Sequence, residues 1–350
     1  MRQLLPFFCV LGSLYTPSLA GLCEQGWHPT FSSKAAWDDA SALVCAVATR
    51  YHNGQDKHTQ PEQYRNQNSP PEVANSMTLD KSKSDAGTAE QQQDASDDGV
   101  ILMDDAHASY AKLVAALESL GFEVHIPRLP SIDNVRPPKS DLSDDTKIIR
   151  SFAENLLKEG KTIIALLHSY GGHVDSNALY GLGLEARSAQ GLPGGISHLI
   201  YLAGYMLLEG TTMIDKIREF GHESLIPINF DIAEDNSCLH RYPKAVVVNP
   251  QPGEVDEKEL DDYVNTFERW NIQCIHQGVK HEAWREIPVS YIYTTHDRVV
   301  AASYQKHFVE TLEQEGYKVR TFELTTGHCP NLTALEGVVD VVKKVYEDQE

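Results

Sequence analysis

The chain has 350 residues, 41% of them hydrophobic and 8% aromatic, so it is long enough for about two domains and apolar enough to bury a large core. Fifty acidic against thirty basic residues give a formal net charge of −20, which would repel nucleic-acid phosphates and anionic membrane surfaces. The longest apolar run after the N-terminus, Leu199 to Leu208, is about half of the ~20 residues that a transmembrane helix needs. We therefore expect neither a nucleic-acid partner nor a membrane span.

Residues 1–20 are typical of a secretory signal peptide. Arg2 precedes an apolar stretch from Leu4 to Leu14, and Ser18 and Ala20 give the small-residue pattern that signal peptidase accepts. We expect this segment to be removed and the protein to be secreted, the alternative being a cytoplasmic protein with a short buried terminus. The cysteines do not decide between the two, because five remain after processing and an odd number indicates no disulfide framework.

The next segment, residues 21–98, is predicted to be poorly structured. From about Gln55 to Asp98 it is polar and nearly free of large aliphatic side chains, so it cannot bury enough apolar surface to offset the loss of chain entropy. Residues 21–54 contain two tryptophans and one short apolar patch, which is too little for an independent domain. We expect the folded domain to comprise residues 99–350.

After Gly99, short apolar runs alternate with amphipathic stretches. Tyr110, Leu113 and Leu117 recur at helical spacing, and Gly121 is placed to end that helix. The predicted strands are Val100–Met103, Phe122–Ile126, Thr162–Leu167, Leu199–Ala203, Val289–Tyr293 and Lys318–Leu324. The predicted helices are Ala108–Leu120, Asp144–Leu157, Tyr304–Glu315 and Asn331–Tyr346. This alternation predicts an α/β fold with a mostly parallel sheet flanked by helices.

The alternation breaks between Glu209 and Ile287, a long, helix-leaning stretch interrupted by prolines. We predict an inserted helical lid at about 209–287. Its apolar residues would either roof a hydrophobic pocket or form the lid's own core, and we expect the second for most of Met206, Leu207, Leu208, Met213, Ile214, Phe230, Trp270 and Trp284.

Ligands of parallel sheets bind at the carboxyl ends of the strands, so the residues that follow each strand matter most. The strand Thr162–Leu167 leads directly into His168-Ser169-Tyr170-Gly171-Gly172 and a helical stretch, which is the context of a nucleophile elbow. Two glycines after Ser169 would let strand and helix approach, whereas Leu167 stands where the G-x-S-x-G motif has its first glycine. The motif is therefore partial, and an ordinary Ser-Gly turn is the alternative.

Two later strands end in residues that could complete a catalytic triad. Val289–Tyr293 is followed by Asp297, which by itself could equally cap a helix or lie in a solvated turn. The last strand is followed by His328 on a glycine-containing loop, where a single histidine is more often a surface or core residue. The order Ser169, Asp297, His328, with each residue after its own strand, is nevertheless the chain order of the α/β-hydrolase triad.

A metal site is not predicted. The chain has no C-x-x-C and no H-E-x-x-H, and its close pairs Asp105-x-His107 and His173-x-Asp175 lack a recognisable third ligand. No cofactor is implied.

Five further stretches extend the pattern from Gly99 to Glu350: LPS at Leu129–Ser131, EGKTIIALLHSYGG at Glu159–Gly172, GGISHLIYLAGYMLLEG at Gly194–Gly210, AWREIPVSYIYTTHDRVV at Ala283–Val300 and GHCPNL at Gly327–Leu332. In these the chain resembles a small single-domain α/β-hydrolase of the group that contains plant methylesterases, hydroxynitrile lyases and many microbial esterases. The resemblance implies that Ser169 attacks a carbonyl, His328 relays its proton and Asp297 orients the imidazole. It also implies that the backbone N–H of Tyr170 is one oxyanion donor.

One segment departs from this family pattern. The second oxyanion donor comes from a glycine-containing loop after the first core strand, but here Met103 is followed by Asp104-Asp105-Ala106-His107. A carboxylate beside a developing oxyanion is unfavourable, and losing one donor costs ~10²–10³ in rate. Either another residue of this loop supplies the N–H with both aspartates turned outward, or catalysis is impaired, or the gene model is mis-spliced here.

The sequence thus predicts a serine hydrolase that cleaves a small, mostly apolar carboxylic ester or lactone through an acyl-enzyme, with that small molecule as its partner. Two alternatives stay open. Asp104 and Asp105 favour a non-catalytic ligand-binding protein, and the triad could also serve a hydroxynitrile-type lyase. In known lyases of this type a lysine near the acid assists, and here Arg298 is the only cation adjacent to Asp297.

The sequon at Asn331 is expected to stay unmodified because it lies three residues from His328.

Overall fold

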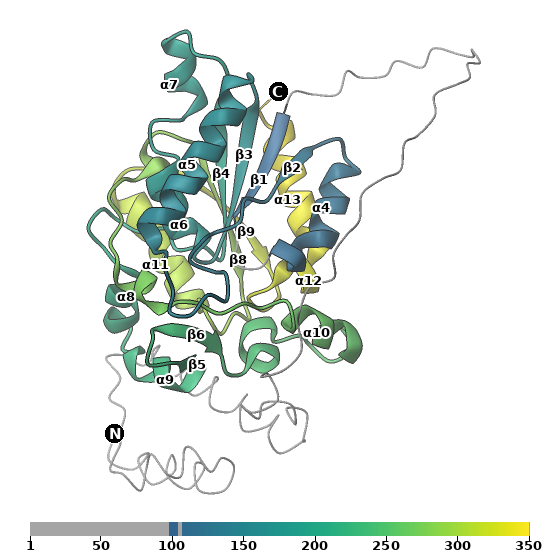
Figure 1. Ribbon diagram of the computed structural model, residues 1–350. Helices are drawn as coiled ribbons and strands as arrows, with labels where there is room; N and C mark the ends of the chain where they lie inside the picture. The colour runs from purple at the N-terminus through teal and green to yellow at the C-terminus, as the bar shows by residue number, and fades with distance from the viewer. Residues whose placement is uncertain (1–97, 104–106, 350) are drawn as a thin grey trace, which may run out of the picture.

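The computed structural model describes residues 98–103 and 107–349 (Figure 1). The predicted signal peptide, nearly all of the segment 21–98, and Asp104, Asp105 and Ala106 of the expected oxyanion loop lie outside these residues. Within the described ranges, no helix combines the length and the apolar character that crossing a bilayer requires.

Six parallel strands form the central sheet, in the order β2-β1-β3-β4-β8-β9. Their bounds are β1 (Asp98–Met103), β2 (Glu123–His125), β3 (Thr162–His168), β4 (Gly195–Leu202), β8 (Val289–Thr294) and β9 (Val319–Leu324). The strand β3 lies between β1 and β4 and is buried on both faces, which is why its sequence is a continuous apolar run. The predicted α/β fold with a parallel sheet is confirmed.

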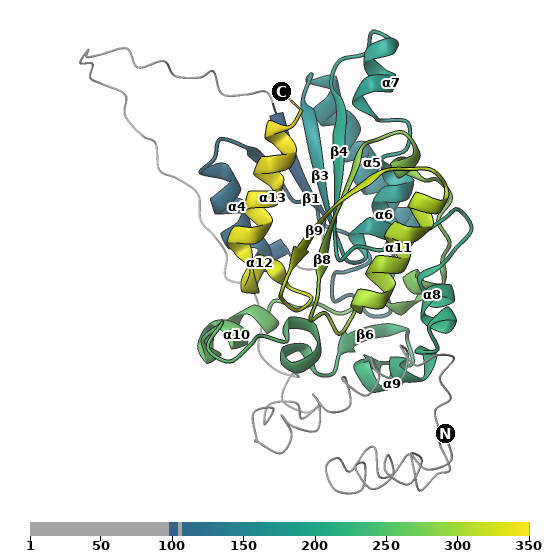
Figure 2. The same ribbon diagram turned by 180° about the vertical axis from the view of Figure 1, so that it is seen from behind.

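Helices cover both faces of this sheet (Figures 1 and 2). Ile164 and Leu166 of β3 pack in the core beneath α4 (Ala111–Glu118) and α13 (Leu335–Glu347). Ile163, Ala165 and Leu167 point the other way, into the core shared by the helices α5 (Leu142–Lys158), α6 (Gly171–Ala178) and α11 (Ala302–Gln314). The alternation of side chains along one strand therefore builds two cores, one on each face.

Most element boundaries shift from the prediction by one to three residues, and three differences are larger. The strand β4 begins at Gly195 rather than Leu199, because Gly195, Ile196 and the polar His198 pair with β3 while Ser197 lies at an irregularity in the register. The helix α7 (Leu184–Ala189) is short and was not predicted. The predicted helix Asn331–Tyr346 is divided at Ala334 into α12 (Pro330–Thr333) and α13, since Ala334 leaves the helical conformation with φ −146° and ψ 40°.

The segment between β4 and β8, called here the inserted segment, is helical only in part. It contains α8 (Met213–Glu219), α9 (Ile226–Asn229), α10 (Glu257–Val264), the π-helical turn η4 (Pro243–Val248) and the 3-10 turns η3 (Glu223–Leu225), η5 (Ile272–His276) and η6 (Ala283–Arg285). It also forms an antiparallel sheet of β5 (Phe230–Ile232), β6 (Ser237–His240) and β7 (Trp270–Asn271). In Figures 1 and 2 the bulk of it lies below the central sheet, at the carboxyl ends of the strands.

Candidate active site

Ser169 lies in a sharp turn between β3 and α6. Its φ of +53° is in the left-handed region, which a serine adopts only when the surrounding structure holds it there. A Cβ at Gly172 would lie 2.7 Å from the carbonyl oxygen of Tyr205, so the close approach of the helix requires glycine. The turn predicted as a nucleophile elbow thus has the strained serine and the close packing of one.

Leu167, which stands where the motif has its first glycine, is packed against a glycine from the segment that follows β4. Leu167 is buried, and Gly204 lies against its backbone, since a Cβ at Gly204 would be 2.6 Å from the Leu167 carbonyl oxygen. Glycine at position 204 therefore allows this segment to approach the backbone of Leu167 closely.

Ser169, His328 and Asp297 meet at the carboxyl ends of three strands. The Oγ of Ser169 lies 2.9 Å from Nε2 of His328, and Nδ1 of His328 lies 2.7 Å from Oδ2 of Asp297. All three residues are more than 90% buried. A carboxylate accepts hydrogen bonds, so His328 carries its proton on Nδ1 and leaves Nε2 free to accept from the serine hydroxyl.

The carboxylate of Asp297 is held from both sides. Its Oδ1 accepts from the backbone N–H groups of Val299 and Val300 at 2.8 and 2.9 Å, and its Oδ2 accepts from the hydroxyl of Thr294 at 2.9 Å as well as from His328. Gln305 of α11 donates to the same Oδ2 at 3.4 Å. Asp297 therefore stabilises its own turn and orients the imidazole at the same time.

A second histidine, His168, connects three parts of the site. Its Nε2 lies 2.7 Å from the carbonyl oxygen of His328, so Nε2 carries the proton, and its Nδ1 lies 2.7 Å from the Tyr110 hydroxyl. Because Tyr110 ends the short 3-10 helix η2 (His107–Tyr110), His168 connects that helix with the serine turn and the segment that carries His328. The sequence places His168 in the predicted elbow, but no local pattern indicates that it connects Tyr110 with His328.

Tyr170, the predicted oxyanion donor, is anchored by its side chain. Its hydroxyl donates to Oδ2 of Asp145 at 2.7 Å, and Ser131 donates to the same carboxylate from its N–H at 2.9 Å and its hydroxyl at 2.6 Å. Burial raises the pKa of Asp145, and these three hydrogen bonds oppose that rise. The backbone N–H of Tyr170 lies at the N-cap of α6, where helix N–H groups are unpaired within the helix and can face a developing negative charge.

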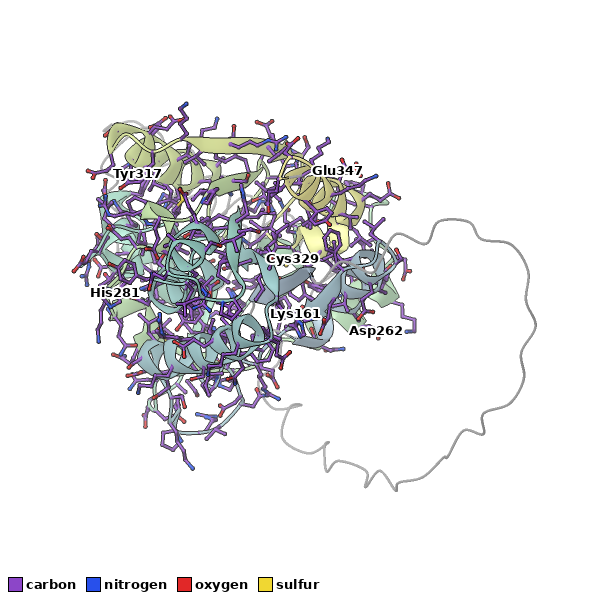
Figure 3. All side chains as sticks on the ribbon, turned by 90° about the horizontal axis from the view of Figure 1, so that it is seen from above. Lys161, Asp262, His281, Tyr317, Cys329 and Glu347 are labelled. Atoms are coloured by element: carbon purple, nitrogen blue, oxygen red, sulfur yellow. The ribbon has the colours of Figure 1, made fainter. Side chains whose placement is uncertain are left out.

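Two cavities lie beside Ser169. The larger, about 150 Å³, is mainly apolar and extends between α8, α9 and α11. The smaller, about 60 Å³, is lined by His328, Cys329 and Tyr263 among others. Cys329 is buried, and Figure 3 labels it near the middle of the view from above.

Of the eight apolar residues singled out in the inserted segment, three line the larger cavity: Met213, Phe230 and Trp270. All eight, including these three, belong to the hydrophobic core or pack against it.

Asn331 of the sequon is buried, and its amide donates to the Ser109 carbonyl and the Tyr263 hydroxyl, both at 3.0 Å. A glycan on this nitrogen is incompatible with those contacts.

In the part of the chain that the structure describes, no three His, Cys, Asp or Glu residues are grouped so that they could hold a metal ion. The buried pair His173 and Asp175 lies on α6 behind the serine turn. Burial lowers the pKa of His173 to about 4, so this imidazole is neutral at pH 7, and burial raises the pKa of Asp175 well above its ordinary value.

Comparison with known proteins now decides the family. The model of the alpha/beta hydrolase family matches residues 102–341. This chain belongs to that family. The hydrolase is 25% identical over 244 residues to "Probable hydrolase R7" of Phoma sp., an alignment that covers 67% of this chain and 91% of the relative. It is 22% identical over 237 residues to the alpha/beta hydrolase nvfD of Aspergillus novofumigatus, covering 67% of this chain and 89% of that protein.

Solved structures share the fold. A pyrethroid hydrolase from Sphingobium faniae JZ-2 matches with a TM-score of 0.53 at 20% identity, covering 71% of this chain and 96% of its own. A methylesterase from Arabidopsis gives a TM-score of 0.54 at 15% identity, covering 71% and 98%. Tomato methylketone synthase I gives 0.55 at 14% identity, covering 72% and 98%. These structures show the shared fold, and the match to the family model confirms the predicted α/β-hydrolase superfamily.

Proposed function

We propose that this hydrolase is a serine esterase that cleaves a small, mostly apolar carboxylic ester or lactone through an acyl-enzyme on Ser169. The observation that carries the proposal is the buried hydrogen-bond chain from Ser169 through His328 to Asp297, with distances of 2.9 and 2.7 Å. The hydrolase names of its relatives support the same reaction class.

In the proposed reaction, Ser169 Oγ attacks the ester carbonyl while Nε2 of His328 takes the serine proton. Asp297 stabilises the imidazolium that forms, and the N–H of Tyr170 stabilises the oxyanion. The imidazolium then gives its proton to the leaving alkoxide, and an acyl group remains on Ser169. Water, deprotonated by the same histidine, hydrolyses the acyl-enzyme and restores the serine.

The two cavities support an assignment of the two halves of the substrate. His328 lines the smaller cavity and must protonate the leaving alcohol, so we place the alcohol in the smaller cavity and the acyl group in the larger. The larger cavity is lined by apolar side chains such as Ile217, Leu225 and Val246. Esters of small alcohols with an apolar acyl group are therefore the expected substrates.

The rival proposal is a ligand-binding protein with the same pocket and little turnover. It rests on Asp104 and Asp105 of the sequence, which would repel an oxyanion if they faced the pocket. The same pocket would then bind esters that are released unchanged.

A panel of short-chain aryl and alkyl esters tests the proposal with wild-type protein, Ser169→Ala and a matched control. Ser169→Ala should lower kcat by up to ~10⁶, because a triad serine is not replaceable. Ser188→Ala, at an exposed position of α7, should hydrolyse like the wild type. Retention of activity by Ser169→Ala would overturn the esterase proposal, ester binding without turnover would favour the rival, and cleavage of cyanohydrins alone would indicate a lyase.

A further inference from the structure

His240 faces the candidate active site from the inserted segment. It ends β6, where it pairs in register with Phe230 of β5. Its imidazole packs against the ring of Phe230, with 4.6 Å between the centroids, and against that of Phe267 at 6.4 Å. A paired strand and two aromatic rings therefore fix this imidazole, which makes it more precisely placed than a loop side chain would be.

The position of His240 relative to the cavities is distinctive. Ser169, His240, Trp270 and Val299 line both the larger and the smaller cavity. His240 therefore lies where the two cavities meet, and this is also where the carbonyl group attacked by Ser169 must lie. No sequence motif pointed to this histidine.

The polar atoms of His240 are available to a ligand. Neither ring nitrogen has a hydrogen-bond partner among the residues that the structure describes. Neither is one of the fully buried polar atoms that lack a partner. Burial, with a smaller effect of nearby His328, lowers the pKa of His240 to about 3, so the ring is neutral at pH 7. A neutral imidazole offers one N–H donor and one acceptor nitrogen.

The polar rings of His222 and Tyr304 differ from His240 in this respect. His222 and Tyr304 line the same cavity, but Nδ1 of His222 lies 2.8 Å from the Tyr304 hydroxyl, so these two groups bind each other. Burying a polar nitrogen without a hydrogen-bond partner is unfavourable. We therefore expect water or a substrate atom to hydrogen-bond the imidazole of His240 at the junction.

We propose that His240 is a substrate-binding residue that hydrogen-bonds an oxygen on C2 or C3 of the acyl chain, the two carbons that follow the ester carbonyl. The inference rests on the proposed function of Ser169 and narrows its substrate class to oxygen-substituted esters, such as 2-hydroxy and 3-oxo esters. When the scissile carbonyl is at Ser169, the carbons next to it occupy the cavity junction, within reach of His240. The rest of the acyl chain meets the apolar wall and is hydrocarbon.

Matched esters test this proposal through a selectivity ratio. We compare methyl 3-oxohexanoate and methyl 2-hydroxyhexanoate with methyl hexanoate, and take the ratio of kcat/KM values for each enzyme form. In the wild type at least one substituted ester should be favoured about tenfold, and His240→Phe, which keeps a ring between Phe230 and Phe267, should abolish the preference. His240→Gln, which keeps a donor and an acceptor, should retain part of it.

His276→Phe is the matched control, because it makes the same change at an exposed position of the inserted segment. It should leave the selectivity ratio unchanged. A ratio near one in the wild type, or an equal ratio in wild type and His240→Phe, would overturn the proposal. A preference for oxygen in the alcohol half instead of the acyl half would also contradict it.

A binding measurement separates this proposal from the esterase proposal. Ser169→Ala should bind the substituted esters about tenfold more tightly than methyl hexanoate in calorimetry, and the double variant with His240→Phe should bind both kinds equally. Hydrolysis by the wild type without this difference in affinity or selectivity would leave the esterase in place and remove the role of His240. The affinity difference in a protein that hydrolyses no ester would support the role of His240 and overturn the esterase proposal.

Discussion

Asp297 of this hydrolase has the contacts of a turn residue and also those of a triad acid. Taken alone it could be a turn residue, and its Oδ1 does accept the backbone N–H groups of Val299 and Val300. Its other oxygen lies 2.7 Å from Nδ1 of His328. The turn contacts fix the carboxylate where the imidazole needs it.

Replacing Asp297 with Asn should lower kcat by roughly 10⁴ while leaving the fold and KM nearly unchanged, because the amide permits the wrong imidazole tautomer. Steady-state kinetics on a short aryl ester measures the effect. His296→Ala is the neighbouring control; its side chain is exposed, and we expect a mild effect. A reversal of the two results would mean that another carboxylate, such as Asp262, is the acid.

The residues predicted from the sequence are those that follow their own strands. Ser169, Asp297 and His328 could be predicted because a parallel sheet brings the carboxyl ends of its strands to one edge. His168, Asp145 and His240 could not be assigned roles, because these depend on contacts with residues distant in the chain, such as Tyr110, Tyr170 and Phe230.

At the scale of elements, the long strands and helices were predictable and the inserted segment was not. The strand β3 is a seven-residue element that is apolar from Ile163 to Leu167, and α5 is a seventeen-residue helix whose buried apolar side chains recur at helical spacing. The strands β5, β6 and β7 have three, four and two residues, too few to show a period, and they are stabilised by pairing with each other.

The strand β1 gives a prediction for the N-terminal region. A protein that begins at Asp98 keeps the whole of β1, which lies between β2 and β3, and should unfold cooperatively in urea. A protein that begins at Asp104 lacks this inner strand and should not fold. If the first truncation aggregates, residues 21–54 must contribute to the fold, contrary to the composition of that region.

The sequence Asp104-Asp105, expected to lie near the oxyanion, gives a second prediction at this scale. If Asp104 and Asp105 face the pocket, Asp104→Gly removes a charge and frees the backbone, so kcat should rise by up to ~10²–10³. Asp105→Gly tests the neighbouring position in the same assay. Wild-type hydrolysis of aryl esters at ~1–10³ s⁻¹, with Asp104→Gly neutral or harmful, would instead show a working donor and exclude the binding-protein alternative.

For the whole molecule, the buried His173 predicts a loss of stability in acid. Its pKa is about 4 in the folded protein against an ordinary 6.5, so protons bind the unfolded chain preferentially. Its contribution is fully present above pH 6.5 and is lost as the pH falls toward 4, by about 3 kcal/mol in total.

Urea titrations at pH 7 and pH 5 on the wild type and His173→Leu measure this contribution. The difference between the two proteins isolates His173 from Asp175, whose raised pKa acts with the opposite sign. The variant should lose less stability between the two pH values than the wild type. Equal losses would mean that His173 is not buried as a neutral residue.

The central claim is that Ser169 is an activated nucleophile, and labelling with a fluorophosphonate probe tests it without knowledge of the substrate. We predict that the native protein is labelled, that mass spectrometry places the label on Ser169, and that Ser169→Ala and heat-unfolded protein are not labelled. Asp297→Asn should be labelled much more slowly. Absence of labelling in the native protein, or equal labelling of Ser169→Ala, would contradict the account.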